Sequence, residues 1–305
     1  MSFWKRLLIY QKERFPLLGN ALLVAVFTFS AISYSRISRG AEGFIAWNDF
    51  AIGICLTIGL FFLLRIFDEH KDQEDDRKYR SYLPVPRGLI SLAELRKVGW
   101  AIFAMQAILL VFFQTKMLFL FFIVLGYMLL MGEEFFVPEY LRKRPMLYNL
   151  SHMFIIPLVD IYASGLDWFL EGHSPHWGLA WFFGVSYFNG LVLEFGRKMR
   201  APDYEEEGVN SYTKQYGVKK GPMLWLLFLI ITALLAIGAA LYADYGTFAV
   251  GWFLSCFILC SIPTILFINN PTKKGSKYIE VAAGVWTLLM YFSLGAIPMI
   301  KNLLT

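Results

Sequence analysis

The sequence has 305 residues, of which 57% are hydrophobic and only 17% are charged, and its mean hydropathy is +0.53. These values exclude an ordinary soluble domain and place the chain among membrane proteins. The net charge of +5 is carried by short segments between apolar runs. We therefore expect the positive net charge to reflect membrane topology, and we expect no nucleic-acid partner. The three cysteines, Cys55, Cys256 and Cys260, lie within apolar runs at spacings that support neither a disulfide framework nor a zinc site.

Residues 1–15 are the first feature along the chain. The stretch MSFWKRLLIYQKER mixes large apolar residues with Lys and Arg. This pattern predicts a short amphipathic helix that lies at the membrane interface. The stretch lacks the apolar core and the small-residue cleavage site of a signal peptide.

Nine apolar windows follow, each close to the ~20 residues that a helix needs to cross the hydrocarbon core. The sequence therefore predicts an all-α polytopic membrane protein with about nine transmembrane helices around a central cavity, in a single domain over residues 1–305. The third and fourth windows are the least clearly separated, because only three residues lie between them. The windows lie near 16–35, 48–67, 98–115, 117–137, 146–168, 176–196, 222–242, 246–269 and 278–300.

Lys and Arg are distributed unevenly over the segments between these windows. With a cytoplasmic N-terminus, 24 of the 28 Lys and Arg residues fall on the cytoplasmic side. This asymmetry follows the positive-inside rule. We therefore expect an integral multi-pass protein with its N-terminus in the cytoplasm, its C-terminus outside, and both acidic segments described below facing the cytoplasm. The four exceptions are Arg36, Arg39, Lys116 and Lys301.

The most informative stretch is 64–88, LRIFDEHKDQEDDRKYRSYLPVPRG, at the end of the second window. Asp68, Asp72 and Asp76 recur every fourth residue, so on a helix they form one acidic stripe. Like charges at this spacing repel one another unless a cation lies against them. Mg²⁺ takes one or two carboxylates and completes its shell with water and substrate phosphates. The stripe therefore predicts a metal–phosphate site, with a solvated charged loop as the alternative.

A second cluster follows the sixth window, in EFGRKMRAPDYEEEG, residues 194–208. Glu194 shares a helical face with Arg197 and Lys198, which follow it by three and four residues. Arg and Lys bind phosphate oxygens directly, whereas carboxylates reach phosphate only through a metal ion. A diphosphate bound with Mg²⁺ needs both kinds of side chain. The alternative is a salt-bridge network at the membrane surface.

These segments resemble the motifs of the UbiA superfamily of intramembrane prenyltransferases, which has nine helices. DEHKDQEDD, residues 68–76, is similar to the family's NDxxDxxxD motif after the second helix. PVPRGLIS, residues 84–91, is similar to its RPxPxGxIS continuation. YLRKR, residues 140–144, resembles the family's YxxxK element between the fourth and fifth helices. The resemblance implies a UbiA-like fold over most of the chain.

The chain also departs from the family pattern. Asp68 stands where the family usually has Asn, and Leu83 where it usually has Arg. The second segment lacks a strict DxxxD motif, although Asp203 and Glu207 have that spacing. The metal ligand of this segment stays open among Glu194, Asp203, Glu205 and Glu206.

The resemblance implies a prenyl diphosphate whose head is bound through Mg²⁺ at the two acidic segments, with its chain among the helices. Basic side chains would neutralise the diphosphate as the C–O bond breaks. The implied catalytic residues are Asp72, Asp76 and Lys198. The implied metal ligands are Asp68, Asp72, Asp76, Glu194, Asp203 and Glu206. The implied diphosphate-binding residues are Arg65, Lys71, Arg144, Arg197, Lys198 and Arg200.

Polar residues inside the apolar windows are further candidates, because their burial in lipid is costly. We expect them to bind an acceptor or line the cavity, with interhelical hydrogen bonds or an interfacial position as the alternative. These residues are Asn20, Glu133, Glu134, Asn149, Asp160 and Asn189.

The function that these features favour is Mg²⁺-dependent transfer of a prenyl group from an isoprenyl diphosphate to an aromatic or lipid acceptor. The alternative is a UbiA-type terpene cyclase, in which an alkene of the same substrate captures the cation. A transporter is less favoured, because its ionisable residues would lie in the middle of the membrane. The sequence contains no GxxxxGK[ST] phosphate loop, and its four histidines are too scattered for a di-iron site.

Overall fold

The structure is a computed structural model that describes residues 1–206, 208 and 211–304. Every regular element in this part of the chain is helical, and nine of its helices are long and apolar enough to cross a membrane. The spans are α2 (Leu17–Ser38), α3 (Trp47–Lys71), α5 (Leu92–Phe113), η1 with α6 (Thr115–Gly132), α8 with α9 (Pro145–Trp168), α10 (Leu179–Arg197), α12 (Lys220–Tyr242), α13 (Phe248–Asn269), and α14 with η4 and α15 (Lys273–Leu304).

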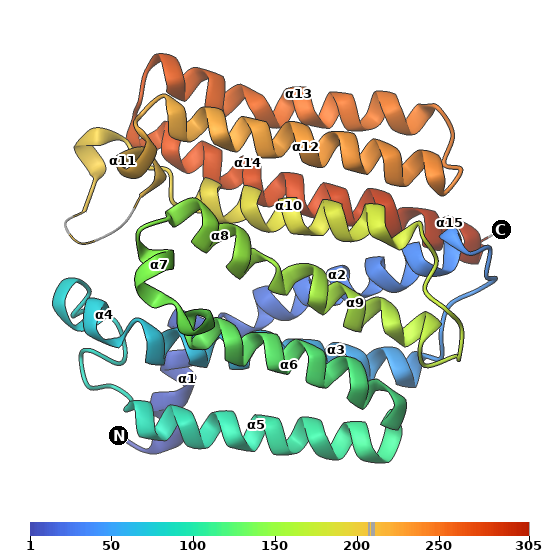
Figure 1. The fold of residues 1–305 in the computed structure, drawn as a ribbon, viewed down its shortest axis with the longest axis horizontal. Helices are drawn as coiled ribbons and strands as arrows, with labels where there is room; N and C mark the ends of the chain where they lie inside the picture. The colour runs from blue at the N-terminus through green and yellow to red at the C-terminus, as the bar shows by residue number, and fades with distance from the viewer. Residues whose placement is uncertain (207, 209–210, 305) are drawn as a thin grey trace.

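The short helices between the spans gather at one end of the bundle (Figure 1). These are α4 (Gln73–Tyr79) after the second span, α7 (Pro138–Arg142) after the fourth, and α11 (Tyr212–Tyr216) after the sixth. The N-terminal helix α1 (Phe3–Arg14) lies at the same end, and the C-terminus lies at the opposite end (Figure 1). Both acidic segments are therefore at one end of the molecule.

The third span begins earlier than its hydropathy predicts. Ser91 caps the helix, since its hydroxyl accepts a hydrogen bond from the Glu94 backbone while the Glu94 side chain accepts one from the Ser91 backbone. This reciprocal pair satisfies two backbone donors at once and starts α5 at Leu92, ahead of the expected window at 98–115. Local capping therefore places charged residues inside the first turns of the helix.

Three other spans also differ from the windows. The fourth was expected to reach residue 137 but ends at Gly132, because the next turn, η2 (Glu134–Phe136), is left-handed. The fifth is broken at Phe154 into α8 (Pro145–Met153) and α9 (Ile155–Trp168). The ninth runs beyond the expected window at both ends and contains a π-helical turn, η4 (Phe292–Ala296), between α14 and α15.

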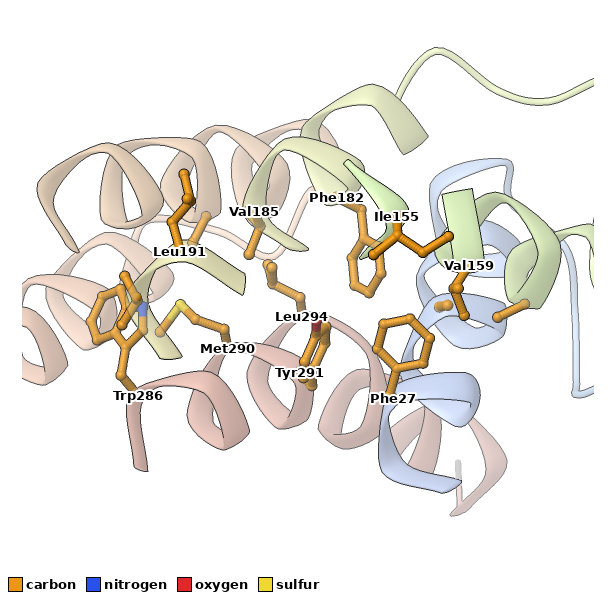
Figure 2. Packing of buried hydrophobic residues seen from close by; sticks show 14 of the residues in the cluster. Phe27, Ile155, Val159, Phe182, Val185, Leu191, Trp286, Met290, Tyr291 and Leu294 are labelled. Carbon is orange, nitrogen blue, oxygen red and sulfur yellow. The ribbon is translucent and has the colours of Figure 1, made fainter. Parts of the chain in front are cut away.

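The core of the bundle lies where α10 packs against α9, α12 and α14. Phe182 of α10, Tyr291 of α14 and Phe27 of α2 pack together there, with ring centroids 5.3 Å apart for Phe27 and Tyr291 and 6.0 Å apart for Phe182 and Tyr291 (Figure 2). Gly295 lies so close to Ser30 that a Cβ atom would collide with the Ser30 backbone. Small residues at such contacts let membrane helices approach closely.

The outward faces of the spans carry large apolar side chains, such as Phe112, Leu234 and Leu259. Exposed apolar surface on this scale is unusual in a soluble protein but normal for a surface that contacts lipid. Together with the nine apolar helices, it establishes an integral, multi-pass membrane protein.

Asp167 organises the end of the bundle opposite the acidic segments. Its carboxylate is fully buried and lies 2.8 Å from the Arg36 guanidinium group and 2.6 Å from that of Arg39. The Ser35 hydroxyl donates a further hydrogen bond to it. Glu171, which is more exposed, bonds to the same two arginines. This network ties the ends of α2 and α9 together.

Candidate functional site

The first acidic segment lies at the end of α3. The helix is interrupted at Asp72, and α4 begins at Gln73. The backbone hydrogen bonds from Asp72 to Asp68 and from Asp76 to Asp72 are both 2.9 Å long, so the helical spacing of the three aspartates continues through the interruption. The Asp68 side chain is 43% exposed, and its nearest cation is Arg65, 3.6 Å away.

Asp76 and Glu69 form the buried side of this segment. The Asp76 carboxylate lies 2.9 Å from Arg80 and 3.8 Å from Arg14. The Glu69 carboxylate lies 2.6 Å from Arg14 and 3.0 Å from Arg65. Three arginines therefore already neutralise these two carboxylates.

Asp72 is in a different environment. Burial raises the pKa of its carboxyl group, and the charge of Asp76 raises it further, while the charges of Lys71, Arg65 and Arg80 oppose this. Asp72 forms no ion pair with any described residue. Asp68 and Asp72 are thus the two carboxylates of the stripe whose oxygen atoms remain open to a ligand.

The second cluster is built around Glu194, in the last turn of α10. Its carboxylate lies 2.6 Å from the Arg197 guanidinium group and 2.5 Å from the Lys198 ammonium group. The Tyr212 ring of α11 stacks on Phe195 at a centroid distance of 3.7 Å. This stacking brings the Tyr212 hydroxyl to 3.5 Å from Glu194.

Tyr212 links this cluster to the fifth span. Burial raises the pKa of its hydroxyl, and the nearby charge of Glu194 raises it further, so the group stays protonated and acts as a donor. It donates a hydrogen bond of 3.0 Å to the Asn149 side chain of α8. Asn149 is therefore placed beside Glu194, at the edge of the site.

The two clusters meet between α3 and α10. Asp68 and Glu194 are near enough for their charges to repel one another. Tyr148 of α8 is within electrostatic reach of Asp68, Asp72 and Glu194. Two segments that are more than 120 residues apart in sequence thus lie within electrostatic reach of one another. We call this region, with Arg197 and Lys198 beside Glu194, the acidic site.

Lys71 fixes Tyr148 at this meeting point. Its ammonium group donates a hydrogen bond of 2.5 Å to the Tyr148 hydroxyl and lies 2.7 Å from the Glu134 carboxylate. It also lies 3.0 Å from the imidazole of His152, which stacks on Tyr148 at 3.9 Å. Lys71 is therefore engaged with protein groups rather than facing open space.

An unusual turn brings Glu134 to Lys71. Glu134, Phe135 and Phe136 have φ angles of 50°, 54° and 59°, in the left-handed region that residues with a side chain seldom adopt. Such a conformation costs of order 1–3 kcal/mol for each residue and persists only where surrounding contacts impose it. The ion pair between Glu134 and Lys71 is one contact that holds this turn.

Several predicted site residues lie apart from this meeting point. Asp203 and Glu206 are exposed and form no ion pair with any described residue, and Glu207 lies outside the described residues. Glu205 accepts hydrogen bonds from the hydroxyls of Ser211 and Thr213. Two arginines lie over tyrosine rings, Arg144 over Tyr140 and Arg200 over Tyr204.

The predicted polar residues of the spans also separate into groups. Glu133 is exposed, next to the partly buried Glu134. Asn20 and Asn189 line a cavity of about 130 Å³ among the helices. Asp160 of α9 is fully buried, within reach of the hydroxyl of Ser186 of α10.

The cavity lies directly below the acidic site. Phe61 of α3 lines it, seven residues before Asp68, which corresponds to about 10 Å of helix. Leu193 of α10 also lines it and immediately precedes Glu194. A ligand with a charged head at the acidic site would therefore place the atoms next to that head over an apolar space.

Comparison with solved structures reveals the same architecture. The structure of a digeranylgeranylglyceryl phosphate synthase in membranes aligns with a TM-score of 0.60 over 96% of this chain and 99% of that chain, at 16% identity. A UbiA homologue from Aeropyrum pernix K1 aligns with a TM-score of 0.61 over 87% of this chain and 96% of that chain, at 15% identity. The chain has the UbiA fold.

This result confirms the predicted fold class, with nine spans of the UbiA type in the described part of the chain. No family model matches the sequence, and none of the curated proteins matches it. The likeness to other UbiA folds is therefore carried by the arrangement of the helices rather than by overall sequence identity.

Within this UbiA fold, four residues of the site were not among the predicted site residues. Arg14 comes from the segment expected to lie at the interface, and its partner Glu69 is adjacent to Asp68 in sequence. Tyr148 and Tyr212 are placed by helix packing. The position of Glu69, four residues after Arg65, was the one signal in the sequence that could have identified an ion pair here.

The carboxylates of the site can be compared with the ligands that Mg²⁺ requires. No group of three His, Cys, Asp or Glu side chains in the described residues is close enough to hold a metal ion alone. Mg²⁺, however, usually takes only one or two carboxylates, with phosphate and water supplying the other oxygens. Asp68 and Asp72 satisfy that requirement, because neither is closely bound to a cation. The residues therefore fit a metal that arrives with a diphosphate.

Proposed function

We propose that the protein is an intramembrane prenyltransferase that binds an isoprenyl diphosphate with Mg²⁺ and transfers the prenyl group to an aromatic or lipid acceptor. The observation that carries this proposal is the meeting of the acidic ends of α3 and α10, at Asp68 and Glu194, over an apolar cavity. The UbiA fold supports it, since one of the similar structures is a synthase named for a prenylated glyceryl phosphate.

Asp68 and Asp72 would hold the metal on the side of α3. When bound, Mg²⁺ would neutralise the diphosphate oxygens and make the diphosphate a better leaving group. Glu194 is the carboxylate of α10 that faces this position, although Arg197 and Lys198 now bind it. Asp76 would hold the acidic segment in place through its ion pairs with Arg80 and Arg14.

Arg197 and Lys198 would bind the diphosphate directly. Their side chains are 66% and 43% exposed and begin at the end of α10, so they can turn from Glu194 toward an anion. Arg offers a planar pair of donors that matches two phosphate oxygens, whereas Lys offers a compact charge. Both charges would stabilise the diphosphate as it accepts the electron pair of the broken C–O bond.

The apolar cavity would receive the allylic cation that remains after the diphosphate leaves. Phe27, Phe61 and Tyr291 line it and present aromatic rings. Aromatic faces attract a cation without bonding to it. In a transferase, the acceptor then forms the new bond to carbon and releases a proton.

The test is a product assay on membranes that contain the protein. A panel of isoprenyl diphosphates would be supplied with and without aromatic and lipid acceptors, and the products identified by mass spectrometry. The proposal expects a prenylated acceptor that disappears with EDTA and returns with Mg²⁺. A cyclic hydrocarbon formed without an acceptor would instead indicate the terpene cyclase, and diphosphate release without Mg²⁺ would contradict the proposed role of the acidic site.

Asp72→Asn is the decisive variant, because it removes a carboxylate that no described cation binds. We expect at least about a 100-fold loss of turnover, the scale seen when a group that stabilises transition-state charge is removed. Asp75→Asn is the matched control, since Asp75 is exposed on α4, three residues further on. Equal loss in both variants would show that the effect is not specific to the site.

A further inference from the structure

Four polar side chains from three helices converge inside the bundle, away from the acidic site. Asp160 lies on α9, Ser186 and Asn189 on α10, and Tyr291 on α14. Asp160 is within reach of Ser186, and Tyr291 is within reach of Asp160, Ser186 and Asn189. Asp160, Ser186 and Asn189 are completely buried. This group, here called the inner polar cluster, lies within the membrane-spanning part of the chain.

The members of the inner polar cluster do not satisfy one another. Both carboxylate oxygens of Asp160, the hydroxyl of Ser186 and both amide atoms of Asn189 lack a well-formed hydrogen bond. Tyr291 lies near Ser186 and Asn189, but at a geometry that leaves their atoms unpaired. An unsatisfied polar group in a membrane interior costs several kcal/mol. A purely structural cluster would be expected to form interhelical hydrogen bonds instead.

The cluster opens onto the cavity through Asn189 and Tyr291, which both line it. The cavity volume is about 130 Å³, and most of the lining is apolar. A cavity of about 150 Å³ holds one benzene molecule, so this space accommodates a single ring or a branched group of similar size. Phe27 also lines the cavity, and its ring centroid lies 5.3 Å from that of Tyr291; Figure 2 shows these two side chains next to each other.

Asn189 is the lining residue whose polar atoms remain available. Of the other polar residues in the lining, Thr287 donates its hydroxyl to the Ala283 carbonyl oxygen at 2.9 Å. Asn20 donates its amide to the Pro16 carbonyl oxygen at 3.0 Å. Among the described residues that line the cavity there is no Lys or Arg, and the Asp160 carboxyl lies behind the wall. These features disfavour an anion and favour a neutral polar group.

We propose that the inner polar cluster binds the hydroxyl group of a small neutral molecule whose apolar body fills the cavity. A hydroxyl offers one donor and two acceptor positions, which match the amide oxygen and nitrogen of Asn189 and the phenol of Tyr291. Asp160 and Ser186 lie within reach of the Tyr291 phenol. This binding site does not rest on the proposed function, and because the cavity holds one group of this size, the molecule would occupy it only when the allylic group does not.

The test compares phenol with toluene, two probes of nearly equal size that differ in the hydroxyl. Binding to the purified protein in lipid nanodiscs would be measured by saturation-transfer NMR, with protein-free nanodiscs as the blank for lipid uptake. One net neutral hydrogen bond of about 1 kcal/mol corresponds to a roughly fivefold higher ratio of phenol affinity to toluene affinity than a purely apolar site gives. Asn189→Leu should abolish this preference, measured as the ratio of the two affinities within each protein. Thr287→Val, the matched control, should keep it.

A phenol-to-toluene ratio in the unchanged protein no higher than the ratio in the protein-free nanodiscs would overturn the inference, and that comparison needs no variant. A preference for phenol that survives in Asn189→Leu would overturn the role of Asn189. Displacement of phenol by benzoate would overturn the assignment to a neutral ligand. Because no outcome depends on turnover, a protein that binds phenol but transfers no prenyl group would refute the proposed function and leave this inference intact.

Discussion

The guanidinium group of Arg14, on the N-terminal helix, lies 2.6 Å from the buried carboxylate of Glu69, on the second span. Arg14 also lies 3.8 Å from Asp76. Two further contacts hold the same helix at this end of the bundle, Arg6 with Glu94 and Glu13 with Arg87. The segment of residues 1–15, predicted only to lie at an interface, is thus also bonded to the acidic segment of α3 and α4.

Arg14→Gln should therefore destabilise the protein. Glu69 would keep its bond to Arg65, and Asp76 its bond to Arg80. Each buried carboxylate would nevertheless lose one of the positive charges that neutralise it. We expect a loss of about 1–3 kcal/mol in the free energy of unfolding, measured by thermal or denaturant unfolding in detergent. Lys12→Gln, an exposed position on the same helix, is the control and should change little.

Removing the charge of Asp72 should stabilise the protein when no metal is present. The raised pKa of Asp72 means that its ionised form is less favourable in the folded than in the unfolded protein. At neutral pH this costs stability, and the cost should fall as the pH is lowered through the raised pKa. Asp72→Asn should therefore raise the Tm in EDTA, by about 2 °C.

Added Mg²⁺ with inorganic diphosphate provides the complementary measurement for Asp72. A ligand that binds only the folded state raises the Tm, so the unchanged protein should gain stability and Asp72→Asn should gain less. If Asp72→Asn lowers the Tm in EDTA, Asp72 has a structural partner rather than an open carboxylate.

Glu134 should support turnover through Lys71 and Tyr148, as a positioning residue. Glu134→Gln removes the charge that holds the Lys71 ammonium group at 2.7 Å. Loss of an outer partner of this kind typically costs 10- to 100-fold in activity, so we expect a fall in kcat of roughly 10-fold. Glu133→Gln is the matched control, because Glu133 is the exposed neighbour. A purely structural role would appear instead as an equal loss of Tm and folded yield with kcat per folded molecule unchanged.

At the opposite end of the bundle, Asp167→Asn should affect stability rather than chemistry. It would leave Arg36 and Arg39 without their shared buried partner. Breaking a buried ion pair costs about 3–5 kcal/mol. Glu171→Gln removes a more exposed carboxylate from the same arginines and should cost about 1 kcal/mol or less. Unfolding in detergent would compare the two, and a similar loss in both would contradict the central role of Asp167.

The orientation in the membrane can be tested by labelling. Positive-inside charge predicts that the loop after α4 is cytoplasmic and that the turn between α5 and α6 is external. In a background without Cys55, Cys256 and Cys260, we expect Thr115→Cys to react with an impermeant maleimide on intact cells. Ser81→Cys should react only after permeabilisation. The reverse pattern would overturn the predicted orientation.

Local sequence explains most of the helices and some of the differences between their predicted and observed bounds. The apolar windows identified nine spans because a membrane helix needs about 20 predominantly apolar residues to cross the hydrocarbon core. α5 begins earlier than predicted because Ser91 and Glu94 form a capping box, which a hydropathy window does not detect. The left-handed turn from Glu134 to Phe136 was also missed, since nothing local favours positive φ in these residues.

The sequence predicted only part of the candidate site. Periodicity and charge selected Asp68, Asp72 and Glu194 as residues of interest, and the structure brings Asp68 and Glu194 within electrostatic reach. Spacing could not show that Arg14 and Arg80 bind Asp76. The choice among nearby cations depends on packing between distant segments.

The sequence by itself determined the membrane-spanning helices and their charged ends, because lipid forces each span to satisfy its backbone hydrogen bonds internally and to be predominantly apolar. Only the tertiary structure decided which charged ends meet and which carboxylates remain open. It also decided which buried polar groups, such as Asn189, face a cavity without a partner. The reason is physical: those outcomes depend on the relative positions of helices, and helix positions follow from packing across the whole bundle.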